Sequence, residues 1–243
     1  MITPVWPAPA AVRAVSTTRS GGVSAGCFAG LNLAMHTGDA PAQVRENRRR
    51  LAAALNLPAD ILWIRQRHGV TAVNAAAHYD RPPEADASWT SEPGKVCVVQ
   101  SADCLPVLLC DRAGDRVAAA HAGWRGLCAG VLERVVADLG CNPAHVLAWL
   151  GPAIGPAAFE VGPEVRAAFL RADAGAKAAF VAHGPSRYRA DLFALARRRL
   201  RQAGVAAVYG GGLCTYSDPQ RFFSYRRDGV TGRMASLIWL APP

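Results

Sequence analysis

Long hydrophobic runs are missing from this sequence, in which no stretch approaches the roughly 20 apolar residues that a membrane-spanning helix needs. The first residues also lack the basic segment and apolar stretch of a secretory signal. We therefore expect a cytoplasmic protein with no membrane partner. Charged residues make up only 19% of the chain and hydrophobic residues 51%, a balance that excludes a disordered or fibrous protein.

The signatures of several common enzyme classes are absent as well. The chain contains no P-loop, no G-x-G-x-x-G, no H-E-x-x-H and no C-x-x-C, so nucleotide-loop, zincin and zinc-ribbon interpretations lose their main support. Its seven cysteines are an odd number, scattered over 243 residues, and a chain of that length buries a core without disulfides. A cysteine with a special role is therefore expected to be catalytic or to bind a metal.

Lysine is scarce, because only Lys95 and Lys177 stand among the 27 basic residues that oppose 18 acidic ones. The formal charge of +9 thus comes almost wholly from arginine, whose planar fork suits phosphate-bearing anions. Biased codon usage explains such a surplus equally well. A basic nucleic-acid-binding module stays open as one hypothesis, through predicted helices that carry the arginine runs 48–50 and 197–199. These helices lack the interleaved aromatic residues of single-strand platforms, so we rank it last.

Hydrophobic patterns predict one domain over residues 1–243. Strands are expected at 12–18, 61–66, 70–75, 95–100, 105–110, 117–121, 146–150, 221–227 and 233–240, with an Asp228-Gly229 turn joining the last two. Helices are expected at 39–55, 127–139, 163–172 and 191–203. Hairpins mixed with helices favour a layered α+β protein with mixed sheets over a strict alternation of strand and helix.

Three segments place a metal ligand or nucleophile at the end of an apolar strand, beside Gly or Pro. They are Gln66-Arg-His68-Gly, Ser101-Ala-Asp-Cys104-Leu-Pro and His121-Ala-Gly-Trp-Arg-Gly. A hairpin turning at residues 111–115 would align strands 105–110 and 117–121 and bring Cys104 close to His121. Two imidazoles and a thiolate supply three zinc ligands, as in catalytic sites that keep a fourth position open.

These residues support more than one kind of chemistry. With zinc bound to His68, Cys104 and His121, a water becomes a nucleophile at neutral pH, and the neighbouring Asp103 could orient a histidine or handle protons. Without a metal, Cys104 could act as a thiolate nucleophile with His121 as its base. In a third interpretation the residues carry no chemistry: Cys104 packs in the core and the histidines are capped surface residues. The spacing alone leaves all three interpretations open.

Seven short motifs follow one another along nearly the whole chain. They are residues 16–24 (STTRSGGVS), 30–33 (GLNL), 102–106 (ADCLP), 121–126 (HAGWRG), 151–155 (GPAIG), 159–162 (FEVG) and 222–229 (FFSYRRDG). Taken together they resemble the YfiH family, also called the laccase-domain, polyphenol oxidase or peptidoglycan-editing-factor family.

The resemblance implies purine nucleoside phosphorylase activity on adenosine, inosine and methylthioadenosine, together with adenosine deaminase activity; the partners are then small-molecule nucleosides and phosphate. It implies an α/β/β/α sandwich with mixed sheets, similar to the catalytic domain of the cytotoxic necrotizing toxins. It also places the family's metal ligands on His68, Cys104 and His121. The peptidoglycan-editing name keeps a second enzyme hypothesis, a Cys104-dependent hydrolase or amidase acting on cell-wall precursors.

Phosphorolysis needs cations that hold phosphate while the purine base leaves. Guanidinium groups pair bidentately with phosphate oxygens, and four arginines of the family-like motifs are candidates: Arg19, Arg125, Arg226 and Arg227. Solvated salt bridges on the surface are the structural alternative for each of them.

Other substrate contacts are assigned on the same basis. Gly22 and Ser24 would offer backbone N–H and hydroxyl groups to ribose or phosphate. Trp124 would stack on the purine, and Asn32 and Gln66 would contact the base or the sugar. A tight turn and core packing are the structural alternatives for these residues.

Composition also tests the laccase name. A four-copper oxidase needs several imidazoles at each of three coppers besides a His₂Cys copper, and the chain has six histidines in all. A multicopper laccase is therefore not supported. Zinc is the expected metal and copper a substitute, because copper outcompetes zinc on affinity. The sequence shows no exposed heptad or other pattern typical of a subunit interface, so we expect a monomer.

Overall fold

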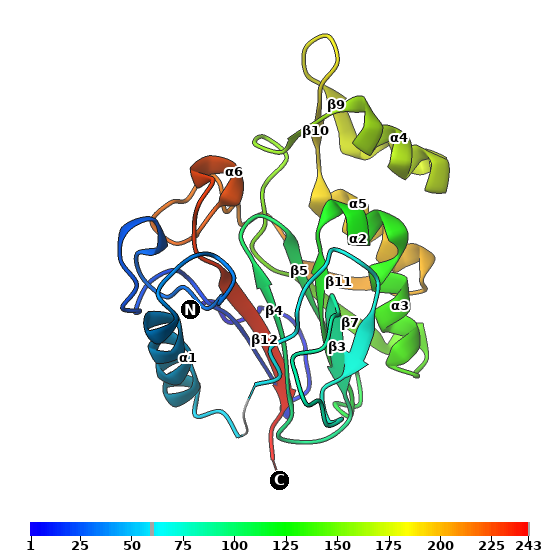
Figure 1. The fold of residues 1–243 in the computed structure, drawn as a ribbon. Helices are drawn as coiled ribbons and strands as arrows, with labels where there is room; N and C mark the ends of the chain where they lie inside the picture. Colours follow the sequence, from blue (N-terminus) through cyan, green and yellow to red (C-terminus); the bar gives the residue numbers. More distant parts are fainter. Residues whose placement is uncertain (59–60, 243) are drawn as a thin grey trace.

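The computed structural model of the chain describes residues 1–58 and 61–242 and contains three β-sheets with helices packed around them (Figure 1). The largest sheet has the strand order β11-β7-β5-β6-β3-β2. Its strands are β2 (Ala72–Asn74), β3 (Ala87–Thr90), β5 (Leu105–Asp111), β6 (Val117–Ala122), β7 (Val146–Leu150) and β11 (Ala207–Gly210). Two of its pairs are parallel, β11 with β7 and β2 with β3, and the other three are antiparallel. The predicted α+β class with mixed sheets is confirmed.

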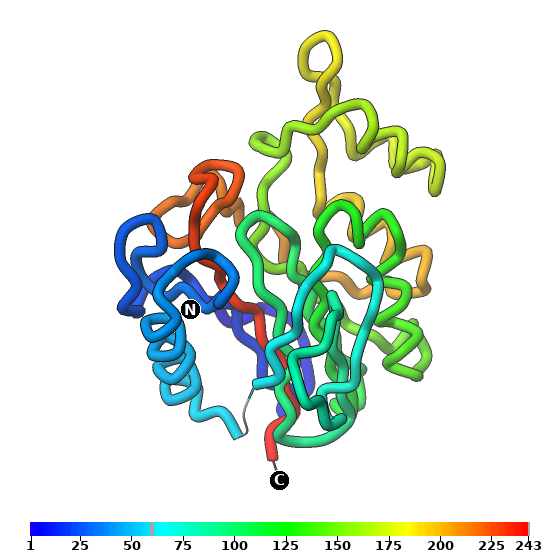
Figure 2. Tube along the Cα trace, viewed as in Figure 1, coloured from blue at the N-terminus to red at the C-terminus, as the bar shows by residue number. Residues whose placement is uncertain are grey.

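A second sheet brings the two ends of the chain together. Its order is β1-β12-β4, all antiparallel, with β1 (Val12–Ser16), β4 (Val96–Ser101) and β12 (Met234–Leu240). Figure 2 shows the red C-terminal strand running along the middle of the molecule. Apolar side chains of this sheet, such as Cys97 and Ile238, form one buried cluster with Leu108 and Val117 of the six-stranded sheet. The two sheets therefore pack face to face.

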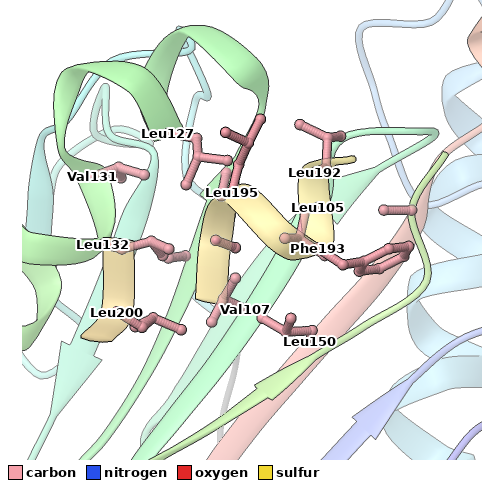
Figure 3. Close-up of a cluster of buried hydrophobic side chains, with 14 of the residues drawn as sticks. Leu105, Val107, Leu127, Val131, Leu132, Leu150, Leu192, Phe193, Leu195 and Leu200 are labelled. Atoms are coloured by element: carbon pink, nitrogen blue, oxygen red, sulfur yellow. The ribbon is translucent and has the colours of Figure 1, made fainter. Parts of the chain in front are cut away.

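Helices cover the outer faces of both sheets. Helix α1 (Pro41–Leu55) buries Leu51 against Val98 and Leu237 of the three-stranded sheet. Helices α2 (Trp124–Ala129), α3 (Val131–Asp138) and α5 (Leu192–Gln202) cover the six-stranded sheet. Figure 3 shows their leucines packed on Leu105 and Val107 of β5. The apolar spacing that predicts these helices is the spacing that fills this core.

A small third sheet forms a lobe at the top of Figure 1. Its order is β8-β10-β9, with β8 (Glu160–Val161), β9 (Phe180–Ala182) and β10 (Tyr188–Ala190), and α4 (Pro163–Ala172) lies beside it. The remaining short elements are the 3₁₀ turns η1 (Gly26–Phe28), η2 (Pro143–His145) and η3 (Ala174–Ala179) and the one-turn helix α6 (Tyr225–Asp228). No helix of the described residues is long and apolar enough to cross a bilayer.

Several predicted elements are wrong, each for a local reason. The helix expected at 127–139 is two helices, because Gly130 adopts a left-handed φ of 104° between α2 and α3. The strand expected at 221–227 is not formed, because the chain there enters the one-turn helix α6, which begins where Ser224 accepts the N–H of Arg227 as an N-cap. The predicted Asp228-Gly229 hairpin is therefore also wrong, and β12 pairs instead with β1 and β4.

Other differences concern short strands. The strand expected at 61–66 is reduced to an isolated bridge at Arg65. Strand β3 and the whole third sheet were not predicted, since strands of two to four residues leave almost no periodic signal. The single domain and the likeness to the toxin catalytic domain stay predictions.

Candidate metal centre

The β5–β6 hairpin brings two candidate metal ligands together. Its register pairs Leu105 with Ala122 and Pro106 with His121, which places Cys104 at the end of one strand beside His121 at the end of the other. The predicted alignment of these two residues is confirmed. His68 joins them from a separate loop, so that the ligand atoms of all three residues lie within 4.8 Å of one another.

His68 belongs to a strained turn. Its φ of 61° is left-handed, a conformation uncommon for residues other than glycine. Asp86 holds this turn, because its carboxylate accepts the backbone N–H groups of Arg67, His68 and Gly69 at 3.0, 2.8 and 2.6 Å. In this conformation, Nε2 of His68 lies 3.8 Å from Sγ of Cys104. The strain sits where a functional constraint is expected.

Asp86 also fixes the second histidine. Its Oδ1 lies 2.9 Å from Nδ1 of His121, and its side chain is only 1% exposed. A carboxylate in this position makes Nδ1 of the imidazole the donor and leaves Nε2 for a metal, the arrangement that orients histidine ligands in metalloproteins. One buried carboxylate thus positions both histidines.

The charges around Cys104 favour its thiolate form, with His121 as its charged partner. Burial opposes ionisation of Cys104, but the charge and hydrogen bonds of His121 and His68 outweigh it and lower the pKa of the thiol to about 6. Burial likewise lowers the pKa of His121, whereas the Cys104 thiolate and Asp86 raise it to a net value of about 9. The thiolate is the form of cysteine that binds metals.

Gly123 leaves the space that an ion requires. A Cβ built on this glycine would lie 2.9 Å from Cδ2 of His68, 3.0 Å from Sγ of Cys104 and 3.5 Å from Cε1 of His121. Even an alanine here would press on His68 and Cys104 and would come into contact with His121. The donor set of two imidazoles and one thiolate, together with this gap, fits a metal ion with three protein ligands.

The three ligands form part of the wall of a cavity of about 450 Å³. This volume lies within the range of small-molecule sites. Its other lining residues include His36, Gln66, Gln100, Ser101, Tyr225 and Arg233. Of the described residues, no Asp or Glu lines the cavity. The site combines a soft metal centre with amide, hydroxyl and guanidinium groups.

Gln66 is the one predicted substrate-binding residue that lines the cavity. Its Nε2 donates to the carbonyl oxygen of Gln100 at 2.8 Å, and its Oε1 accepts the N–H of Gln100 at 2.7 Å. The side-chain amide of Gln66 therefore pairs with the backbone of Gln100 in β4 through both of its polar atoms. A further hydrogen bond to a base or sugar would have to share one of them.

Asp103 does not take the histidine-orienting place that we predicted for it. Thr215 Oγ1 donates to its Oδ1 at 2.6 Å, and the backbone N–H of Arg226 donates to its Oδ2 at 2.6 Å. Asp103 itself has a left-handed φ of 96°. Asp103 therefore links the turn at residues 102–104 (the Cys104 corner) to α6. The residue that orients His121 is Asp86.

None of the four predicted phosphate-binding arginines lines the cavity. Arg19, Arg226 and Arg227 each donate to backbone carbonyl oxygens elsewhere in the fold. The guanidinium of Arg125 lies 4.5 Å from the ring centroid of Trp124, and that ring packs beside the core cluster. The structure thus places these arginines and Trp124 outside the cavity wall.

The predicted residues of the N-terminal loop form a structural network. Ser24 Oγ donates to Asp39 Oδ2 at 2.6 Å, and Asn32 Nδ2 donates to the same oxygen at 3.0 Å. A Cβ on Gly22 would lie 2.2 Å from the carbonyl oxygen of Gly30, so that glycine permits a close backbone crossing. Gly22, Ser24 and Asn32 all lie away from the cavity lining.

The fold and the site define a mixed α+β protein with a candidate His₂Cys metal centre. The family model described as "Multi-copper polyphenol oxidoreductase laccase" matches residues 13–241. Purine nucleoside phosphorylase YfiH of Escherichia coli (strain K12) is 56% identical over 240 residues, which cover 99% of this chain and 98% of that protein. Purine nucleoside phosphorylase PA4543 of Pseudomonas aeruginosa is 58% identical over 240 residues, 98% of each chain. The chain belongs to this laccase-domain, or YfiH, family.

Solved structures share the fold. The crystal structure of Neisseria meningitidis protein NMB0706 is 50% identical, with a TM-score of 0.96 and coverage of 99% of both chains. A Bacillus licheniformis hypothetical protein YfiH is 32% identical, with a TM-score of 0.88, covering 94% of this chain and 92% of that one. The family resemblance seen in the sequence motifs is confirmed.

Proposed function

We propose that the chain is a zinc-dependent purine nucleoside phosphorylase that cleaves adenosine, inosine and methylthioadenosine, and that it also deaminates adenosine. The observation that carries the proposal is the cluster of His68, Cys104 and His121 on the wall of a cavity of about 450 Å³. The names of the relatives at 56% and 58% identity support the phosphorylase part. Zinc suits the mixed nitrogen and sulfur donor set, and copper is a substitute for it.

In this proposal the chain's own residues build and orient the site. His68, Cys104 and His121 would hold the metal, which when bound supplies Lewis acidity at an open coordination position. Asp86 binds Nδ1 of His121 and so leaves Nε2 of this ring for the metal. The lowered pKa of Cys104 keeps its thiolate available at neutral pH. The absence of a side chain at Gly123 leaves room for the ion.

The two reactions balance without any further reactant. In phosphorolysis of inosine, a phosphate oxygen bonds to C1′ while the bond from C1′ to N9 breaks, and its electron pair stays on the base. The proton of hydrogen phosphate ends on the base, giving hypoxanthine and ribose 1-phosphate. In deamination, water adds at C6 of adenosine and ammonia leaves, giving inosine.

The test is incubation of metal-assayed protein with inosine or adenosine, with and without phosphate, followed by separation of the products. We expect hypoxanthine and adenine only when phosphate is present, and inosine from adenosine in either case. Protein that contains zinc and releases no base in the presence of phosphate would refute the phosphorylase proposal. Absence of inosine would refute the deaminase part alone.

A second candidate function is a Cys104-dependent hydrolase, and the lowered pKa of this thiol favours it. In metal-free protein we expect alkylation of Cys104 to become faster as the pH rises, with half-maximal rate near pH 6, because the thiolate is the reactive form. Turnover that survives exhaustive chelation and is lost on alkylation would support the hydrolase. Turnover that needs the metal would exclude it.

The arginine runs give little support to a nucleic-acid-binding module. Arg49 and Arg50 both pair with Glu46, and in α5 Arg198 pairs with Asp173 and Arg199 with Glu133. Phosphates would have to displace these carboxylates. A cytoplasmic monomer and the α/β/β/α sandwich classification stay part of the proposal.

A further inference from the structure

Arg233 is the arginine that lines the cavity. It immediately precedes β12, whose first residue Met234 pairs with Ser101 at the end of β4. The Cys104 corner follows Ser101 directly, so this pairing places Arg233 next to the segment that carries the thiol. The sheet, and not a flexible loop, sets its position relative to the metal ligands.

The backbone of Arg233 is fixed on both sides. Its N–H donates to Oδ1 of Asn32 at 3.0 Å, and its carbonyl oxygen accepts the N–H of Leu33 at 3.2 Å. The buried network of Asn32, which we had assigned to the substrate, therefore supports this arginine instead. A fixed backbone means that ligand binding costs little further ordering of the chain.

The guanidinium of Arg233 is held along one edge. Its Nη1 donates to the carbonyl oxygens of Thr231 and Gly232 at 2.9 and 3.0 Å. These are the hydrogen bonds that the side chain makes to the described residues, and they leave the Nε and Nη2 edge for another acceptor. That edge presents two parallel N–H groups, the fork that matches two oxygens of a phosphate.

No carboxylate of the described residues forms a salt bridge with Arg233. Burial lowers the pKa of Arg233, and the negative charges of Cys104 and then Asp103 offset only part of this effect. Both oxygens of Asp103 accept hydrogen bonds from Thr215 and Arg226. The pKa of His36 on the same cavity wall is also lowered, by burial and then by the positive charges of Arg233 and Arg48. An arginine and a histidine thus share the cavity wall.

We propose that the Nε and Nη2 edge of Arg233 binds the phosphate oxygens in the cavity. The inference deepens the proposed phosphorylase function and rests on it. It replaces Arg19, Arg125, Arg226 and Arg227 as the residues that hold the anion. In the balanced reaction given above, Arg233 neutralises the phosphate before and after its oxygen bonds to C1′ and takes no part in proton transfer.

The experiment compares zinc-loaded wild-type protein with Arg233→Gln and Arg233→Lys, and with Arg49→Gln as the control. Arg49 carries the same charge on the exposed face of α1, where its side chain is 69% exposed. Two measurements are made with inorganic phosphate: the rise in melting temperature as phosphate is added, and the KM for phosphate in the release of hypoxanthine from inosine. Zinc content is measured in every variant.

For Arg233→Gln we expect the phosphate KM to rise about 10- to 100-fold, the loss expected for a charged, bidentate hydrogen-bonded pair. Phosphate should no longer stabilise this variant, while its zinc content and KM for inosine stay near wild type. Arg233→Lys keeps the charge without the fork and should fall in between. Arg49→Gln should match wild type in both measurements.

An unchanged phosphate KM and unchanged stabilisation in Arg233→Gln would overturn the inference while leaving the phosphorylase proposal intact. Stabilisation by phosphate that requires Arg233, in a protein that releases no base, would refute the phosphorylase proposal and retain the anion site. If Arg233→Gln does not fold, Arg233→Lys decides the question, because full phosphate affinity in a lysine variant contradicts a bidentate site.

Discussion

The two ends of the β5–β6 hairpin are built alike and behave differently. Each end has a cysteine, Cys110 in β5 near the turn and Cys104 directly before β5 at the open end. Each end also has an aspartate that accepts three backbone N–H groups. At the turn, Asp111 accepts those of Gly114, Asp115 and Arg116. At the open end, Asp86 accepts those of Arg67, His68 and Gly69.

The histidines account for the difference between the two cysteines. Burial raises the pKa of Cys110 near the turn to about 12. Burial acts in the same direction on Cys104, yet His121 and His68 bring its pKa down to about 6. Two cysteines six positions apart in the sequence thus differ as an inert core thiol and a thiolate, because partner charges can outweigh desolvation. Substitutions of matched residues at the two ends of the hairpin test this difference.

The largest effect is expected from removing the thiol at the open end. Cys104→Ala deletes a metal ligand, so zinc should be lost and turnover should fall by about 100-fold or more. Metal analysis after dialysis and product assays measure the two losses. Cys110→Ala is the matched control and should keep its zinc. If Cys104→Ala retained one tightly bound zinc, the assignment of the metal centre would be wrong.

A smaller effect is expected when the carboxylate at the open end is changed. Asp86→Asn should weaken zinc binding by about 10- to 100-fold, because the amide no longer fixes the tautomer of His121 or the His68 turn with full charge. Competition with a chromophoric chelator measures the affinity. Asp111→Asn removes the matching charge at the turn and should bind zinc like wild type. Equal affinities in the two variants would show that Asp86 has no positioning role.

The smallest effect is expected at the turn itself. Asp111→Asn should lower the free energy of unfolding by about 1–2 kcal/mol, because one charged acceptor of three N–H groups becomes a neutral one. Urea denaturation followed by fluorescence measures this difference, with turnover unchanged in the absence of urea. A loss of activity larger than the loss of stability would contradict the separation of the two ends.

The part of the site that the sequence predicted depends on local pairing. A short antiparallel hairpin has few possible registers, so strands 105–110 and 117–121 were enough to place Cys104 beside His121. Asp103 was predicted because it precedes Cys104, but its left-handed φ of 96° turns the chain between β4 and β5 in a way that no periodic pattern reveals. Its carboxylate accordingly faces Thr215 and the α6 backbone.

The part that escaped prediction depends on distant packing. Asp86 directly precedes β3, a four-residue strand with little periodic signal, and it meets His121 through the pairing of β3 with β6. Arg233 reaches the cavity because β12 pairs with β4, more than a hundred residues earlier in the chain. Single-sequence patterns carry no information about such pairings.

The three ligands are supported unevenly: the hairpin holds two of them and a separate turn holds the third. Cys104 and His121 lie at the end of the paired strands β5 and β6, which fix their backbone positions. His68 lies on a left-handed turn that is held by the carboxylate of Asp86. The geometry of the whole cluster therefore depends most on the one turn that no strand ladder supports.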